Sequence, residues 1–279
     1  MAGGICPVGV AVKRIMERLA LTGSTLCFLA GSAFAVYSMG ARTFRPSRAS
    51  FWVVLAGFLL QTFFLSVRGE ALGRCPLTNR FEVLVFLAWA MVLFYLLIGT
   101  AYRLSLLGLF TAPMALGIQG LALLVPGLDR LPQRVPAPNP WMEMHAALSV
   151  LAYGAFALAG VAGGMYLAQE RQLKTHHLRS FFFGLPPIQD LAVANRRLVA
   201  VGFGLLTLGL LAGFAMGGWT AHWVKVAWSA LVWLLYGGIL VAVGGHRWGG
   251  RRVAWLSLWA IVAVLGTLWS LRFISNPAA

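Results

Sequence analysis

The sequence predicts an all-α integral membrane protein, a polytopic bundle of about eight transmembrane helices. Two observations support this prediction. Apolar residues make up 60% of the 279-residue chain and charged residues only 10%, with a mean hydropathy of +0.82, whereas about a quarter of the residues of a soluble domain are charged. Apolar runs of membrane-spanning length also recur from residue 19 almost to the end. We therefore expect residues 1–279 to form a single integral membrane domain.

Each predicted span is a stretch of about 20 mostly apolar residues, which is the length that carries an α-helix across the hydrocarbon core. The fourth stretch is the weakest, because Pro113 and Pro126 interrupt it. The first has an apolar run of about 20 residues, longer than the roughly 7 to 15 of a signal peptide, so we expect it to stay attached. The stretches lie at 19–40, 50–68, 81–101, 104–126, 142–168, 197–217, 224–244 and 252–273.

The net charge of +15 resides in short loops and predicts membrane orientation. A nucleic-acid site gathers basic residues on a water-facing surface, so no nucleic-acid partner is expected. In the second half of the chain, Lys225 and Arg272 fall on one side of the membrane and eight basic residues on the other. These eight are Arg171, Lys174, Arg179, Arg196, Arg197, Arg247, Arg251 and Arg252. The positive-inside rule makes their side cytoplasmic, which places both termini outside. The first half has basic residues on both sides of its first span and shows no such bias.

Most catalytic motifs are absent from the sequence. There is no P-loop, GxSxG or HExxH pattern, and the chain has only seven acidic residues. The three cysteines, Cys6, Cys27 and Cys75, form no CxxC pair, which disfavours a dithiol carrier or a zinc finger. We expect Cys27 to pack within the first span, and Cys75 to be either a reactive external thiol or an inert loop cysteine. No catalytic residue is predicted.

Two histidines are the main candidates for a functional site, because polar residues at membrane depth are costly. His145 lies one turn inside the fifth predicted span, and small residues follow it that would let another helix or a flat ligand approach closely. His222 lies at the start of the seventh span, at the same membrane face. Imidazole is a common ligand of haem iron, so His145 and His222 could hold one haem axially. The alternative for His145 is an interfacial histidine that hydrogen-bonds a neighbour.

Other residues near the seventh span complete this hypothesis. Lys225 shares a helical face with His222 and could pair with a haem propionate or a lipid phosphate. Most of the 11 tryptophans are expected to anchor the helices at the membrane interfaces. We assign at most Trp219, Trp223 and Trp228 to a ligand surface, with Trp219 and Trp228 as the candidate haem contacts. The expected groove for the ligand lies between the fifth and seventh spans.

Four groups of segments, in order along the chain, resemble a known family. They lie at 76–82 with 86–89, at 141–174 with its His-x-x-x-Ser-x-x-x-Tyr pattern, at 185–191 with 202–213, and at 225–228 with Trp233 and 249–254. Together they make a family-like core of about 76–254. These segments are similar to the haem-handling cytochrome c assembly family that includes CcsA, and especially to its HemX-like and YpjD-like branch.

The resemblance implies a haem-binding, multi-pass protein of the inner (cytoplasmic) membrane. Such a protein would handle or deliver haem at the outer membrane face during cytochrome c maturation, in contact with membrane lipid and with other cytochrome c biogenesis proteins. It would be at most one subunit of a synthetase-type assembly. CcsA-type members carry an external loop of the form WGxxWxWDxxE, whereas the stretch 219–225 here lacks the acidic pair. A further external histidine near the chain end is also missing, which favours the HemX-like branch.

Two other functions remain open at this point. One is a membrane scaffold or regulatory partner with the same fold and no haem, in which His145 would be a packing residue. The other is a transporter of another solute, which would predict discontinuous helices and an internal repeat. We find no convincing repeat between the two halves of the sequence.

Overall fold

The computed structural model describes residues 7–40, 48–99, 105–129, 139–175, 187–216, 223–244, 249–260 and 262. All the regular secondary structure in these ranges is helical, which confirms the predicted fold class. A π-helical turn, η1 (Tyr95–Gly99), continues α3, and residues 250–260 form a further helix. The α-helices are α1 (Pro7–Gly40), α2 (Arg48–Leu72), α3 (Arg80–Phe94), α4 (Ser105–Leu124), α5 (Pro140–Thr175), α6 (Ile188–Ala215) and α7 (Trp223–Gly244).

Each predicted span coincides with one of these helices in chain order, except that the last span is described only over its first part. Five segments are long and apolar enough to cross a membrane: Ile15–Tyr37, Ala49–Leu72, Arg80–Ile98, Pro140–Lys174 and Ile188–Ala215. Two shorter apolar segments, Phe110–Leu124 and Val226–Ala242, fall within α4 and α7. The chain is therefore a multi-pass membrane helix bundle.

Pro113 does not interrupt the fourth span. It lies inside α4, which continues to Leu124. A proline in a helix removes one backbone hydrogen bond, but helices at membrane depth tolerate it when neighbouring helices pack around the site. Here α4 packs against both α1 and α3, and these contacts support the helix through the proline.

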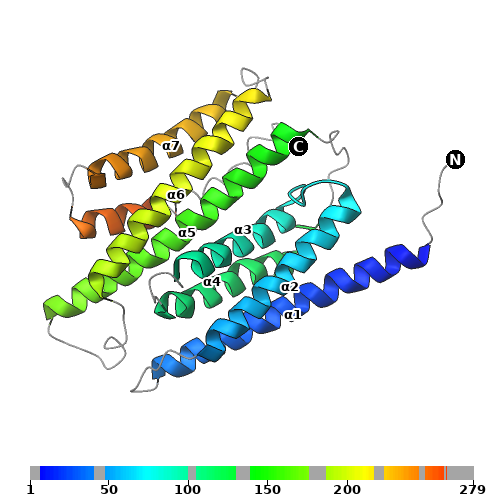
Figure 1. The fold of residues 1–279 in the computed structure, drawn as a ribbon, viewed down its shortest axis with the longest axis horizontal. Helices are drawn as coiled ribbons and strands as arrows, with labels where there is room; N and C mark the ends of the chain where they lie inside the picture. The colour runs from blue at the N-terminus through cyan, green and yellow to red at the C-terminus, as the bar shows by residue number, and fades with distance from the viewer. Residues whose placement is uncertain are drawn as a thin grey trace.

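The helices lie side by side roughly in chain order, from α1 and α2 at one edge of the bundle to α7 at the other (Figure 1). Close packing depends on small residues. A Cβ atom on Gly154 of α5 would lie 2.6 Å from the Cβ of Ala90 on α3, and one on Gly163 would lie 2.9 Å from the carbonyl oxygen of Ala254. Gly154 and Gly163 of α5 thus allow α3 and the 250–260 helix to pack closely against α5.

Side-chain amides join the four N-terminal helices at membrane depth. Gln61 of α2 donates through Nε2 to Oε1 of Gln119 on α4 and to the carbonyl of Val85 on α3, both at 3.0 Å. Gln119 in turn donates through Nε2 to Oγ1 of Thr25 on α1, at 2.8 Å. Gln61 and Gln119 are fully buried. Within a lipid bilayer the hydrophobic effect does not drive helices together. Interhelical hydrogen bonds of this kind therefore contribute to helix association.

α5 links the two ends of the bundle. Its 36 residues extend over about 54 Å at 1.5 Å per residue, more than the roughly 30 Å of the hydrocarbon core. Its first turns meet the 73–79 loop through the contact of Glu143 with Arg74. They also meet the last turns of α6 through the contact of His145 with Gly209. Its last turns meet the start of the 250–260 helix through Glu170 and Arg251. We call these the His145 end and the Glu170 end.

The distribution of charged residues over the two ends can be compared with the predicted orientation. Arg68, near the end of α2, meets Asp129, in the segment after α4, at the His145 end. Lys174 and Arg251, two of the basic residues expected to be cytoplasmic, both contact Glu170 at the other end. Which end faces the cytoplasm stays a prediction.

Candidate functional site

His145 is held in one orientation by α6. Its Nδ1 lies 2.7 Å from the carbonyl oxygen of Gly209, and the imidazole is half-buried. Because a carbonyl can only accept a hydrogen bond, Nδ1 carries a proton, and in the neutral imidazole Nε2 then keeps its lone pair. Metal-ligating histidines commonly show this arrangement, in which one ring nitrogen donates to a backbone carbonyl and the other is left to bind the metal. This orientation would let His145 bind a metal through Nε2.

Two glycines of α6 make room for α5, one beside the His145 ring and one beside Ser149. A Cβ atom on Gly213 would lie 2.9 Å from Nδ1 of His145, and one on Gly209 would lie 3.1 Å from Oγ of Ser149. The hydrogen bond thus requires α6 to come closer to α5 than a larger residue would allow. This pair was not predicted, although the Gly-x-x-x-Gly spacing of residues 209–213 is a known signal for close helix approach.

The start of α5 is fixed from the opposite side by Glu143. Its Oε2 accepts a hydrogen bond from the backbone N–H of Cys75 at 3.2 Å, and its Oε1 lies 3.8 Å from Nε of Arg74. The first turns of α5, which carry His145, are therefore attached to both the 73–79 loop and α6. Such support from surrounding groups keeps a ligand side chain in place before the ligand arrives.

Three carboxylates surround Arg68 at the same end of the bundle. Its guanidinium lies 2.9 Å from Oε1 of Glu82, 2.6 Å from Oδ1 of Asp129 and 3.3 Å from Oε2 of Glu17. We call these four residues the Arg68 cluster. The Glu82 side chain is fully buried, and a buried carboxylate needs such a partner. The cluster joins α1, α2, α3 and the segment after α4.

The 76–82 segment, which carries part of the family resemblance, has a structural role in this arrangement. Asn79 caps α3, since its side-chain oxygen accepts from the backbone N–H of Glu82 at 2.8 Å. Its Nδ2 donates to Asp129 at 3.1 Å. Thr78 donates to Oε2 of Glu82 through its backbone N–H at 2.8 Å and its hydroxyl at 2.6 Å. These hydrogen bonds therefore fix the start of α3 against the segment after α4.

The remaining predicted site residues are located only in part. Trp228 lies on α7 with an exposed side chain. Lys225 also belongs to α7, but its side chain lies outside the described residues, as do Trp219 and His222 altogether. The pairing of His145 with His222 therefore stays a prediction.

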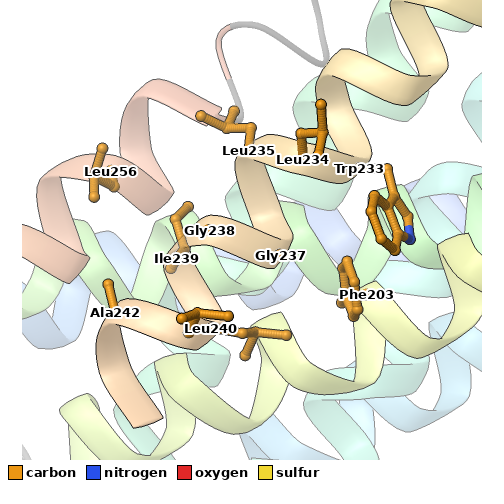
Figure 2. A pocket seen from close by; sticks show the side chains of 11 residues that line it. Phe203, Trp233, Leu234, Leu235, Gly237, Gly238, Ile239, Leu240, Ala242 and Leu256 are labelled. Atoms are coloured by element: carbon orange, nitrogen blue, oxygen red, sulfur yellow. The ribbon is translucent and has the colours of Figure 1, made fainter. Parts of the chain in front are cut away.

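The expected groove between the fifth and seventh spans is closed where Phe156 meets Tyr236. Their rings stack with centroids 3.4 Å apart and an angle of 7° between planes, and both side chains are fully buried. A groove of about 1120 Å³ lies instead along α7, with Phe203 of α6 and Leu256 of the 250–260 helix on its walls (Figure 2). Its lining is apolar apart from the indole N–H of Trp233, which bonds Thr207 at 2.9 Å.

Cys75 has the properties of an inert thiol. Burial raises its pKa, and the carboxylates of Glu143 and Glu82 raise it further. A raised pKa reduces the thiolate fraction at neutral pH, and the thiolate is the nucleophile.

In a background of Cys6→Ser and Cys27→Ser, we expect maleimide to label Cys75 more slowly at pH 7.5 than it labels glutathione. Adding Glu143→Gln should speed the reaction. Labelling of Cys75 as fast as glutathione would contradict this prediction.

Comparison with known proteins agrees with the motifs. The sequence model of the family described as Cytochrome C assembly protein matches residues 77–276. The chain is 29% identical over 253 residues to cytochrome c biogenesis protein CcsA of Synechococcus sp. (strain CC9902), covering 80% of this chain and 81% of that protein. It is 28% identical over 226 residues to CcsA of Guillardia theta, covering 73% and 75%. It is 26% identical over 271 residues to CcsA of Parasynechococcus marenigrum (strain WH8102), covering 87% and 88%. Because the family match spans well over half of the sequence, the chain belongs to the cytochrome c assembly protein family.

Proposed function

We propose that this protein binds haem at the His145 end and handles it for cytochrome c assembly in the inner (cytoplasmic) membrane. Membership of the family and likeness to CcsA proteins support the assembly role. The observation that supports the haem site is the hydrogen bond from Nδ1 of His145 to Gly209, which would leave Nε2 available to bind haem iron. Haem would supply the iron that takes such a nitrogen ligand.

The roles of the other residues follow from their places in the sequence. His222 directly precedes α7 and would be the second axial ligand. Lys225, on the first turn of α7, would pair with a propionate, and Trp219 and Trp228 would contact the macrocycle. We further propose that the chain acts as one membrane domain of the HemX-like branch. The 219–225 stretch lacks the acidic pair of the CcsA-type loop, so delivery to apocytochrome would depend on partner biogenesis proteins.

A scaffold without haem is the second candidate, and one observation favours it. The small residues Gly154 and Gly163 of α5 are in contact with other helices and leave no flat ligand site at those positions. In that case His145 would serve only to hold α5 against α6 through its bond to Gly209.

The visible spectrum of the purified protein distinguishes the two candidates. With haem supplied during expression, we expect a Soret band of bis-histidine character in the wild type. His145→Ala and His222→Ala should each weaken it, while His177→Ala, after the opposite end of α5, should not. His145→Gly should regain the band when imidazole is added, because free imidazole can replace the lost ligand. A wild type without stoichiometric haem, or a band indifferent to both substitutions, would favour the scaffold.

A further inference from the structure

A second pocket lies at the Glu170 end, between the last turns of α5 and the start of the 250–260 helix. Its volume is about 550 Å³. The apolar part of its lining includes Leu167, Trp255 and Leu258, and the polar part consists of Arg171, Lys174, Arg251 and Glu170. The pocket therefore combines an apolar wall with a basic rim.

The wall of this pocket is fixed by close helix contacts. The carbonyl of Ala254 lies against Gly163 of α5, where no Cβ atom would fit without a shift. Asn195 of α6 is buried, accepts from Oγ of Ser257 at 3.0 Å and donates to the carbonyl of Ala159 at 3.0 Å. These contacts hold the 250–260 helix against α5 and α6, so the pocket exists before any ligand binds.

The rim carries more positive than negative charge. Glu170 lies 2.7 Å from Nζ of Lys174 and 3.7 Å from Nε of Arg251. Three basic side chains and one carboxylate leave an excess of two positive charges. The side chains of Lys174 and Arg251 are more than half exposed, at 60% and 62%. Both can therefore reach an anion that enters from the membrane boundary while Glu170 holds them nearby.

We propose that this pocket binds the headgroup phosphate of an anionic phospholipid. Lys174, Arg251 and Arg171 would contact the phosphate, and an acyl chain would lie on Leu167 and Leu258. The apolar stretch predicted from the sequence for this helix ends at residue 168, just before Arg171 and Lys174, so the rim is expected at headgroup depth. Basic pockets between transmembrane helices at this depth bind anionic headgroups. Trp255 is an exposed tryptophan at the same boundary, where such side chains are enriched.

The lining distinguishes a lipid from haem. None of the described residues that line this pocket is a histidine, cysteine or methionine, so none of them offers a usual protein ligand of haem iron. Haem carries carboxylates and a phospholipid carries a phosphate, and the basic rim could pair with either. The lipid, however, needs only these cations and the apolar wall. This proposal stands apart from the haem site at the His145 end and does not depend on it.

The test compares the full-length protein in nanodiscs of phosphatidylcholine with and without phosphatidylglycerol. We expect phosphatidylglycerol to raise the melting temperature of the wild type and native mass spectrometry to show retained lipid. The Lys174→Gln, Arg251→Gln double variant should lose this increase. A matched double variant, Lys13→Gln with Arg252→Gln, removes the same charge from exposed side chains outside the pocket and should keep it.

Glu170→Gln should have the opposite effect to the Lys174→Gln, Arg251→Gln double variant. It removes the carboxylate that competes for Lys174 and Arg251, so the increase caused by phosphatidylglycerol should grow even if the protein is less stable in both lipids. Equal melting in the two lipids would overturn the proposal, as would an equal loss in the matched double variant. Reproduction of the effect by millimolar inorganic phosphate in phosphatidylcholine would assign the site to a free anion and also overturn it.

Discussion

Arg68→Ala is expected to lower the free energy of unfolding by about 3–5 kcal/mol, the usual cost of leaving a buried charge without its partner. Glu82 is fully buried and Arg68 is 17% exposed in its side chain, so water cannot replace the lost guanidinium. The substitution also leaves Glu17 and Asp129 without the cation that joins them. Melting of the purified protein in one detergent, with helicity followed by circular dichroism, measures the loss.

Two variants make this result specific. Lys13→Ala breaks an exposed ion pair with Glu70, 3.8 Å long, and should cost about 0–1 kcal/mol. Arg68→Met combined with Glu17→Gln and Glu82→Gln removes the buried charges together and should recover most of the stability, because buried charges can be replaced by uncharged groups at little cost. A melting temperature of Arg68→Ala within error of Lys13→Ala would show that the Arg68 cluster is not a buried pair.

Gly154→Ala is expected to destabilise the bundle by about 1–3 kcal/mol, the cost of overpacking a filled contact. The new methyl group would lie 2.6 Å from the Cβ of Ala90 and 3.0 Å from its carbonyl carbon. Backbone atoms cannot rotate away as a flexible side chain does, so α3 would have to move from α5. Since α3 and α5 connect the two halves of the bundle, the loss should appear as a lower melting temperature of the whole protein.

Gly204→Ala is the matched control, because a Cβ atom there meets nothing within 4 Å. Alanine is a better helix former than glycine by up to about 1 kcal/mol, so this variant should be as stable as the wild type or more stable. The same substitution thus has opposite signs at two positions in helices. Equal effects at Gly154 and Gly204 would contradict the close contact between α3 and α5.

The Arg68 cluster also bears on the proposed haem site. Arg74, in the loop that follows α2, contacts Glu143 two residues before His145, and the 76–82 segment ties that loop to Glu82 and Asp129. A destabilised cluster should therefore loosen the start of α5. We expect the variants that damage the cluster to weaken haem binding indirectly, without changing the axial ligands.

The surroundings of the predicted site could be foreseen from the sequence only in part. His145 was identified because a histidine at membrane depth is unusual, and its depth follows from its position in the fifth span. Its tautomer depends on Gly209, 64 residues away, and no local pattern names that partner. The groove was expected between the fifth and seventh spans, but Phe156 and Tyr236 meet there. Two aromatic residues in different helices give no sign in the sequence that they stack on each other.

The sequence by itself determined the helical class, the order of the spans and their approximate ends. Lipid requires every backbone group to bond within its own helix, so apolar length is enough to locate each helix. Only the tertiary structure decided that α4 continues through Pro113, that Glu82 is buried against Arg68, and that Gly154 receives α3. These outcomes depend on which neighbour fills the space beside each residue, and that is a property of the packed bundle rather than of any one segment.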